Sequence, residues 1–225
     1  MGDLIAPYLV HLNAMAGGLF LLAAFALVAT RQMLACLRWF VAQALLLAAS
    51  AGVIGIALSS GHLASVAVIT VLMKALATPW LIRRTVRQEL YRRREISQVL
   101  NIPTSLLIGV GLTLLAFVIT TPVTAMAGGL FVKINLPLGL AGLFLGAYTV
   151  AVRREALSQL LGLLAMENGA IFAAVAIAPD LPLIAEITVA FDVPVTTLVI
   201  GLLTRRIHER VGGTSVGLLA ALRER

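Results

Sequence analysis

The chain has 225 residues, of which 60% are hydrophobic and only 12% are charged. Soluble domains carry about 25% charged residues, so this composition excludes an ordinary water-soluble fold and predicts an all-α, polytopic membrane protein. The net charge of +7 would suit nucleic acid. However, the basic residues gather at the ends of apolar segments, which is typical of membrane topology, and we expect no nucleic-acid partner.

Seven apolar segments approach or exceed the length of about 20 residues that a membrane-spanning helix needs. Because a backbone in hydrocarbon must satisfy its own hydrogen bonds, each segment is predicted to be a helix. The segments are 4–30, 38–59, 63–82, 104–121, 136–152, 156–178 and 183–204. The first segment lacks the pattern of a cleaved signal peptide and is expected to remain as a span. Pro103 and Pro137 are expected in the first turns of the fourth and fifth helices, where proline is tolerated.

Basic residues are unevenly shared between the two sides of this predicted array. Lys133 lies on one side and Lys74 lies within the third segment, whereas 15 of the 17 lysines and arginines fall on the other side. Those fifteen are Arg31, Arg38, Arg83, Arg84, Arg87, Arg92, Arg93, Arg94, Arg153, Arg154, Arg205, Arg206, Arg210, Arg223 and Arg225. The positive-inside rule then predicts an outside N-terminus, a cytoplasmic C-terminus and an odd number of spans.

A weak internal repeat with a shift of 122 residues divides the chain. The shift superimposes arginines that follow the spans: Arg31 on Arg153, and Arg83-Arg84 on Arg205-Arg206. Helices one to three would then match helices five to seven, as in transporters with parallel repeats, although shared topology alone could produce the same match. We expect three parts: an N-terminal three-helix half (1–100), a linker with the fourth helix (101–135) and a C-terminal three-helix half (136–225).

The segment 83–98 is a long, strongly basic connection. The simpler interpretation is that it anchors the topology and contacts anionic lipid headgroups at the cytoplasmic face, at about 1 kcal/mol per basic residue. The alternative is a docking strip for a cytoplasmic partner. Both interpretations remain open at this point.

Four ionisable residues lie within the predicted spans: Lys74, Glu167, Glu186 and Asp192. A charge at mid-bilayer is costly and by default suggests function. One interpretation is a relay for protons or ions. The other is structural, in which a lysine–carboxylate pair and hydrogen bonds only fix the helix order. We favour the relay, because three such groups near one depth on three helices exceed what packing alone needs.

Two further polar residues support this set. Asn168 directly follows Glu167, and Thr78 lies one turn after Lys74. Pro79 frees a backbone carbonyl there that a polar group or water can use. Other intramembrane polar residues are expected to form ordinary helix–helix hydrogen bonds: His11, Asn13 and Gln43.

No pattern indicates a catalytic or metal site in this chain. Cys36 is the single cysteine, which excludes an internal disulfide and a cysteine cluster. The histidines fall in different segments without ligand spacing: His11, His62 and His208. We therefore expect no metal, no cofactor and no catalytic residues of its own.

Several stretches carry a resemblance to a known family. The string LAMENG surrounds Glu167, and Glu186, Asp192 and LLTRRI follow it after a short proline-bearing loop. MKALATPWLIRR surrounds Lys74. With these stretches the whole chain resembles hydrogenase-4 component E, a membrane subunit of formate hydrogenlyase-type, group 4 [NiFe]-hydrogenase complexes. Helices five to seven are also similar to the K subunit of respiratory complex I and to the C subunit of multisubunit sodium/proton antiporters.

This resemblance implies a role and a set of partners. The chain would lie between antiporter-like subunits and the membrane anchor of a hydrogenase, in a bacterial or archaeal cytoplasmic membrane, with the redox chemistry in other subunits. Glu167 would take the place of the first of two mid-membrane glutamates, and Asp192 or Glu186 the place of the second. With Lys74 these acids would form part of a proton path. The alternatives are a purely structural spacer and a free-standing small ion transporter.

Overall fold

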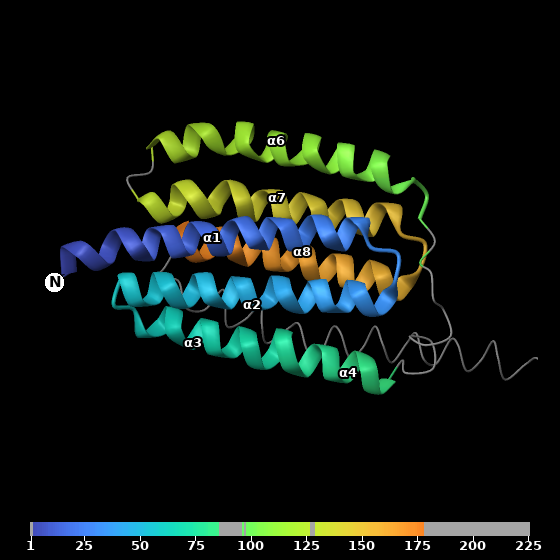
Figure 1. Cartoon of the computed structure of the whole chain (residues 1–225), viewed down its shortest axis with the longest axis horizontal. Coiled ribbons are helices and arrows are strands. Elements are labelled where there is room, and N and C mark those ends of the chain that lie inside the picture. Colours follow the sequence, from blue (N-terminus) through green and yellow to red (C-terminus); the bar gives the residue numbers. More distant parts are fainter. Residues whose placement is uncertain (1, 86–95, 97, 127–128, 178–225) are drawn as a thin grey trace, which may run out of the picture.

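The computed structural model describes residues 2–85, 96, 98–126 and 129–177. These residues are almost entirely helical (Figure 1). The helices are α1 (Gly2–Ala29), α2 (Met33–Ala57), α3 (Gly61–Thr70), the π-helix η1 (Val71–Ala77), α4 (Thr78–Thr85), α6 (Ile102–Met126), α7 (Leu130–Val152) and α8 (Ala156–Ile177). The all-α prediction is therefore confirmed for the described part of the chain.

Six helical rods among the described residues are long and apolar enough to cross a membrane, and the third consists of α3, η1 and α4 in continuous succession. The protein is thus a multi-pass membrane protein. The predicted seventh span, 183–204, lies outside the described residues, as do Glu186 and Asp192. The count of seven and the orientation in the membrane stay predictions.

Three predicted helix boundaries are wrong by five or six residues: the second span begins at Met33 rather than at 38, the fourth ends at Met126 rather than at 121, and the fifth has a misplaced start. The fifth span begins at Leu130 rather than at 136, so Pro137 lies inside α7 instead of in its first turn. Proline is tolerated within membrane helices because neighbouring helices and local adjustments re-satisfy the freed backbone groups. The stretch 101–135, expected as a linker, therefore includes the beginning of α7.

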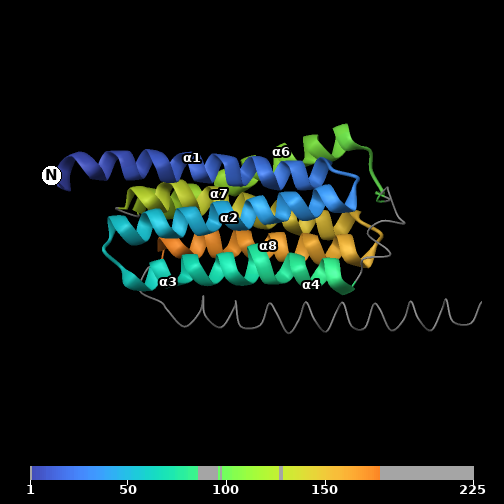
Figure 2. The same ribbon diagram turned by 60° about the horizontal axis from the view of Figure 1, so that its bottom comes forward.

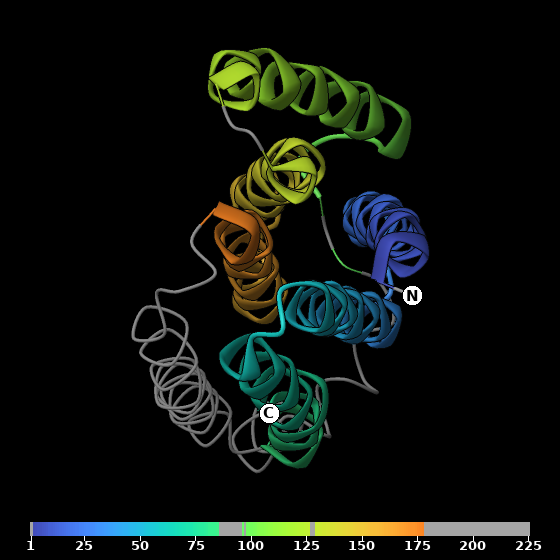
Figure 3. The same cartoon turned by 90° about the vertical axis from the view of Figure 1, so that its left-hand side faces the viewer.

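The core is a bundle of α1, α2, α7 and α8, seen end-on in Figure 3. The α3–η1–α4 rod packs against α2, and α6 packs on the opposite side against α7 and α1. The rods run side by side along the long axis of the molecule (Figure 2). We call the end at which α1, α4 and α7 stop the arginine end, since exposed arginines lie there: Arg31, Arg83, Arg84 and Arg154. The opposite end is called the far end.

The helix boundaries fit the 122-residue repeat. With this shift the end of α1 falls within one residue of the end of α7, and the start of α2 falls within one residue of the start of α8. Asn13 and Asn135, which are 122 residues apart, form a hydrogen bond with each other. The first two helices of each half therefore correspond in position, and their equivalent asparagines meet in the core.

Helices α7 and α8 pack with their backbones in contact. A Cβ atom at Gly169 of α8 would collide with the backbone of Gly142 and Leu143 of α7, and one at Gly146 would collide with the backbone of Met166. Small residues permit this close approach between membrane helices. The position of Glu167 and Asn168 is fixed as a result, because both lie on the turn of α8 that Gly169 holds against α7.

Two apolar clusters fill the bundle at different depths. The arginine-end cluster includes Leu37 and Phe40 of α2 and Leu161 and Leu164 of α8. The far-end cluster has members on α1, α2, α3 and α8, among them Phe20, Leu47, Ile54, Ile171 and Phe172. A polar site lies between the two clusters.

Candidate functional site

Lys74 occupies the middle of the π-helix Val71–Ala77. The backbone N–H of Thr78 donates to the carbonyl of Met73, five residues back, and the Thr78 hydroxyl donates to the same oxygen at 2.9 Å. Pro79 follows and has no N–H with which to continue the pattern. Short π-helical turns are frequent at functional sites. Here the turn carries a fully buried lysine toward α8.

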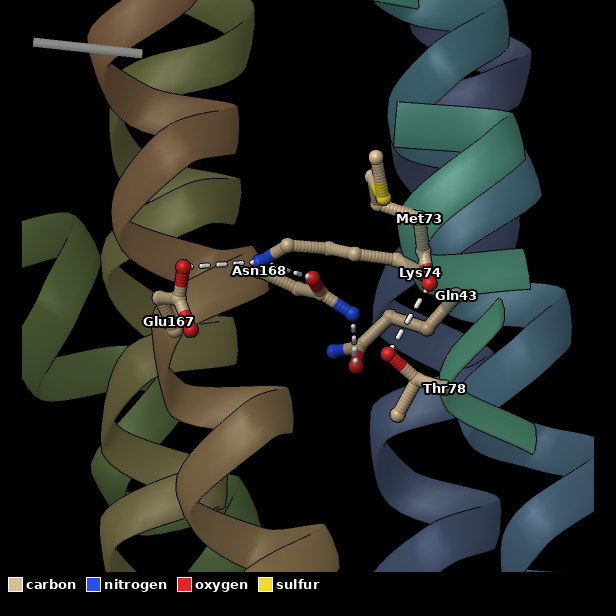
Figure 4. Close-up of polar contacts among 6 residues, drawn as sticks. All are labelled: Gln43, Met73, Lys74, Thr78, Glu167 and Asn168. Carbon is tan, nitrogen blue, oxygen red and sulfur yellow. Dashed lines mark hydrogen bonds and ion pairs between the residues drawn. The ribbon is translucent and has the colours of Figure 1, made fainter. Parts of the chain in front are cut away.

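The Lys74 ammonium lies between two side chains of α8 (Figure 4). Its Nζ is 2.9 Å from Oε1 of Glu167 and 3.1 Å from Oδ1 of Asn168. The ammonium therefore donates to a carboxylate and to an amide that are neighbours in sequence. The structure brings together three of the residues predicted from the sequence, on spans that are about 90 residues apart in the chain.

Gln43 of α2 completes the site. The Asn168 amide, whose oxygen faces Lys74, donates through Nδ2 to Oε1 of Gln43 at 3.4 Å. Nε2 of Gln43 is buried and has no hydrogen-bond partner within the described part of the chain. The sequence predicted an ordinary helix–helix hydrogen bond for Gln43. Its link to Asn168 is such a bond, but it joins Gln43 to the ionisable pair, and nothing in the sequence indicated that partner.

The site lies near the middle of the membrane-spanning segments. Glu167 is central in the span Leu157–Ile177, and Lys74 is close to the centre of Gly61–Arg84. The side chain of Lys74 is 0% exposed and that of Glu167 is 21% exposed. Glu167 is therefore the member of the pair that faces out of the described helices, while Lys74 is enclosed by them.

The chemistry open to this arrangement is proton exchange. An ammonium next to a carboxylate can pass a proton and leave a neutral amine beside a neutral acid, with no change in net charge. The ion pair costs desolvation energy in a low-dielectric interior, and hydrogen bonds to its remaining groups reduce this cost. Asn168 supplies such a bond, and Gln43 holds the Asn168 amide in the orientation that presents its oxygen to Lys74.

The other predicted residues are distributed as follows. Thr78 is buried and stabilises the π-helix instead of contacting the ion pair. Glu186 and Asp192 lie outside the described residues, so the identity of a second acid stays a prediction. His11 is exposed on α1, and the predicted helix–helix hydrogen bond is not formed among the described residues.

A second polar cluster lies nearer the far end and involves α1, α2 and α7. Ser50 Oγ donates to Oδ1 of Asn13 at 2.6 Å, Asn13 Nδ2 donates to Oδ1 of Asn135 at 2.7 Å, and Asn135 Nδ2 donates to Oγ of Ser50 at 2.9 Å. The three bonds close a ring in which each side chain donates once and accepts once. Sequence reasoning expected a hydrogen bond from Asn13 but missed Ser50 and Asn135. The 122-residue shift, which pairs the two asparagines, was the available signal.

Arg153 is a buried arginine at the end of a membrane span, in contrast to the exposed arginines nearby. Its guanidinium is buried directly after α7, and Nη2 donates to three carbonyls at the end of α1: Leu27 (2.8 Å), Val28 (3.2 Å) and Thr30 (2.7 Å). Burial lowers the pKa of Arg153 from its ordinary value, although an arginine stays protonated at neutral pH. Arg153 thus caps α1.

The basic segment 83–98 is described only in part. Arg83 and Arg84 are exposed, and the Arg84 guanidinium lies 5.1 Å from the ring centroid of Trp80. Residues 86–95 and 97 lie outside the described part, so lipid contact and partner docking both stay predictions. Within the described ranges, no three His, Cys, Asp or Glu side chains gather as metal ligands. The predicted absence of a metal or cofactor is not tested by this observation.

Comparison with known proteins gives a relative over nearly the full length. No protein-family model and no solved structure matches the chain. Over 220 residues, covering 97% of this chain and 99% of the relative, it is 34% identical to the uncharacterized protein Rv0085 of Mycobacterium tuberculosis. Identity of this extent indicates a shared fold, and the chain belongs to the same protein family as Rv0085.

Proposed function

We propose that this chain is an integral subunit of a complex I-like membrane assembly of the hydrogenase-4 or formate hydrogenlyase type, and that it contributes a station to a proton path. The observation that carries the proposal is the Lys74–Glu167 ion pair at mid-membrane. Intramembrane ionisable residues of this kind mark proton relays and ion pathways. The redox chemistry would take place in other subunits of the assembly.

Packing alone gives a poor account of the pair. Apolar side chains of similar volume fill such an interface without the desolvation penalty, and replacing a buried ion pair by them is often neutral or stabilising. The bundle already has two large apolar clusters, each with members on α2, on α8 and on the α3–η1–α4 rod that carries Lys74. A charged pair linked to two amides and placed on a π-helix therefore fits a group that changes protonation state better than it fits a structural contact.

The partners follow from the proposed role. Antiporter-like subunits and a hydrogenase-anchor-like subunit would continue the polar path on either side, in a bacterial or archaeal cytoplasmic membrane. Anionic lipids would contact the exposed arginines of the arginine end. The 21% exposure of Glu167 supports a path that continues beyond the described helices. Glu186 or Asp192 would provide a further acid.

The decisive experiment is Glu167→Gln, which keeps the side-chain size and one oxygen that can accept from Lys74, but removes the exchangeable acid. Because the buried Lys74 ammonium loses its counter-charge, we expect a lower yield of assembled complex. Redox-driven proton transport per assembled complex should fall at least about tenfold, measured with a pH-sensitive dye in inverted membrane vesicles. Ser50→Ala serves as the matched control, because it removes a buried polar group from the other cluster and should leave transport per complex unchanged. Unchanged transport in fully assembled Glu167→Gln complexes would refute the relay and favour a structural spacer.

A second candidate function is a free-standing ion transporter. The observation in its favour is the repeat, whose equivalent asparagines meet in the core, since paired repeats are common in secondary transporters. Purification of the tagged chain from its native membrane separates the candidates. A subunit should bring unlike membrane proteins in fixed proportion, whereas a transporter should contain only copies of this chain.

A further inference from the structure

An apolar layer separates the two polar clusters of the bundle. It consists of Phe20 on α1, Leu47 on α2 and Phe172 on α8, each of which is 0% exposed. The rings of Phe20 and Phe172 stack with their centroids 4.3 Å apart and an interplanar angle of 23°. All three side chains belong to the far-end cluster.

The layer covers the two amides of the ion-pair site, Asn168 and Gln43, on their far-end side. Phe172 lies one helical turn beyond Asn168 on α8, and Leu47 lies one turn beyond Gln43 on α2, both toward the far end. Residues four positions apart share a helix face. Phe172 and Leu47 therefore lie directly over the two amides that connect to Lys74.

The same layer lies next to the hydrogen-bonded ring of Asn13, Ser50 and Asn135, on the side of that ring toward the middle of the bundle. Leu47 precedes Ser50 by one turn of α2, and Phe20 follows Asn13 by two turns of α1. Along α2, the order from the far end toward the middle is thus Ser50 of the polar ring, Leu47 of the apolar layer and Gln43 of the ion-pair site.

Gly142 makes room for the Phe20 ring in this layer. A Cβ atom at Gly142 of α7 would lie 2.6 Å from Cε1 of Phe20, and one at Gly17 of α1 would lie 3.4 Å from Cζ of Phe172. The Phe20 ring thus occupies the space that a side chain at Gly142 would take. At Gly17, Cδ1 of Leu138 would lie nearer, at 2.7 Å, and the Phe172 ring would be in van der Waals contact. Apolar constrictions without room for water act as gates by dewetting.

We propose that Phe20, Leu47 and Phe172 form a barrier that closes the Lys74–Glu167 site to water and protons from the far end. The purpose of such a barrier rests on the proposed function, because a relay that opened to the far end would dissipate the gradient it serves. The barrier property itself does not depend on transport. Truncation of one ring would leave a cavity with polar groups at both ends, which is the kind of cavity that water fills.

The test measures access to Gln43 directly. Cys36, the single cysteine, is replaced by alanine, and Gln43→Cys then places a thiol on the middle side of the layer. The full chain stays in sealed native-membrane vesicles, and Ag⁺, which moves through hydrated space, is added from the far-end side. We expect slow reaction of the thiol with the layer intact and at least about tenfold faster reaction after Phe172→Ala.

Phe25→Ala is the matched control. Phe25 lies on α1 and contacts α6 near Gly109, away from both polar clusters, so its truncation should leave the Ag⁺ reaction rate unchanged. Phe20→Ala repeats the test from another helix, in case Phe172→Ala does not accumulate. Fast reaction with the layer intact, or equal rates in the Phe172→Ala, Phe20→Ala and Phe25→Ala backgrounds, would overturn the barrier. Failure of the proposed function would show up separately, as unchanged redox-driven transport in Glu167→Gln.

Discussion

The two polar clusters differ in the way their hydrogen bonds are completed. Asn13, Ser50 and Asn135 form a neutral ring that is closed upon itself and fully buried. The cluster of Lys74 and Glu167 is charged and is partly exposed at the Glu167 side chain. It ends at a buried amide nitrogen of Gln43 that has no partner among the described residues. Both clusters join helices that are distant in sequence, so both can stabilise the bundle.

This difference separates a structural role from a functional one. A closed ring of amides and a hydroxyl has no proton to exchange near neutral pH, and its bonds are complete only in one helix arrangement. An ion pair on a π-helix has two protonation arrangements, and its orphan amide donor can take a water molecule or a changed partner. The variants below test whether the two clusters separate in this way.

Lys74→Met should have the largest effect on stability. It leaves the Glu167 carboxylate without its ammonium, and removal of one member of a buried pair costs about 3–5 kcal/mol. We expect a much lower yield of folded protein and a large drop in the free energy of unfolding, measured by thermal denaturation of the purified protein in detergent. The double variant Lys74→Met, Glu167→Gln should recover most of this loss, because no lone charge remains. A double variant as unstable as the single one would contradict the ion pair.

Gly169→Ala should have the next largest effect, because its methyl group would enter the backbone of α7 at Gly142 and Leu143. Overpacking of this kind costs about 1–3 kcal/mol. It should also move Glu167 and Asn168 away from Lys74, and so lower transport. The control is Gly18→Ala on α1, where no neighbouring atom lies within 4 Å of the new methyl group. Equal thermal stability of the two variants would argue against backbone contact between α7 and α8.

Much of the fold could be predicted from the sequence because hydrophobic length is a strong signal in membrane proteins. The helical class and the six spans seen in the described residues follow from it. The start of α7 was misplaced, because proline stops or begins a helix in soluble proteins but is accommodated within a membrane bundle.

The candidate site was predictable in its members but not in its geometry. Lys74, Glu167 and Asn168 stand out as polar residues in apolar runs. Their meeting depends on the α7–α8 contact and on the π-helix, which turns Lys74 toward α8. Gln43 and Ser50 occur in similar Ala- and Leu-rich surroundings of α2, and the sequence does not indicate that one joins the ion pair and the other the neutral ring.

Ser50→Ala tests the neutral ring and should have a moderate effect. It opens two of the three hydrogen bonds, and hydrogen bonds between membrane helices are worth about 0.6 kcal/mol on average, so the loss should be about 1 kcal/mol. We expect lower thermal stability with the same rate of proton transport per assembled complex. A transport defect larger than the loss of assembled complex would mean that the ring belongs to the path.

Thr78→Val should have the smallest effect on stability and is the sharpest test of the π-helix. It removes the hydroxyl bond to the Met73 carbonyl, but the Thr78 backbone N–H still satisfies that oxygen, so the loss should be about 0.5 kcal/mol. Thr113→Val on α6 is the matched control, since it removes an equivalent bond to the carbonyl of Gly109. If the π-helix sets the direction of Lys74, transport should fall in Thr78→Val alone, while both variants lose similar stability. Equal transport in the two variants would mean that the ion pair holds its geometry without this turn.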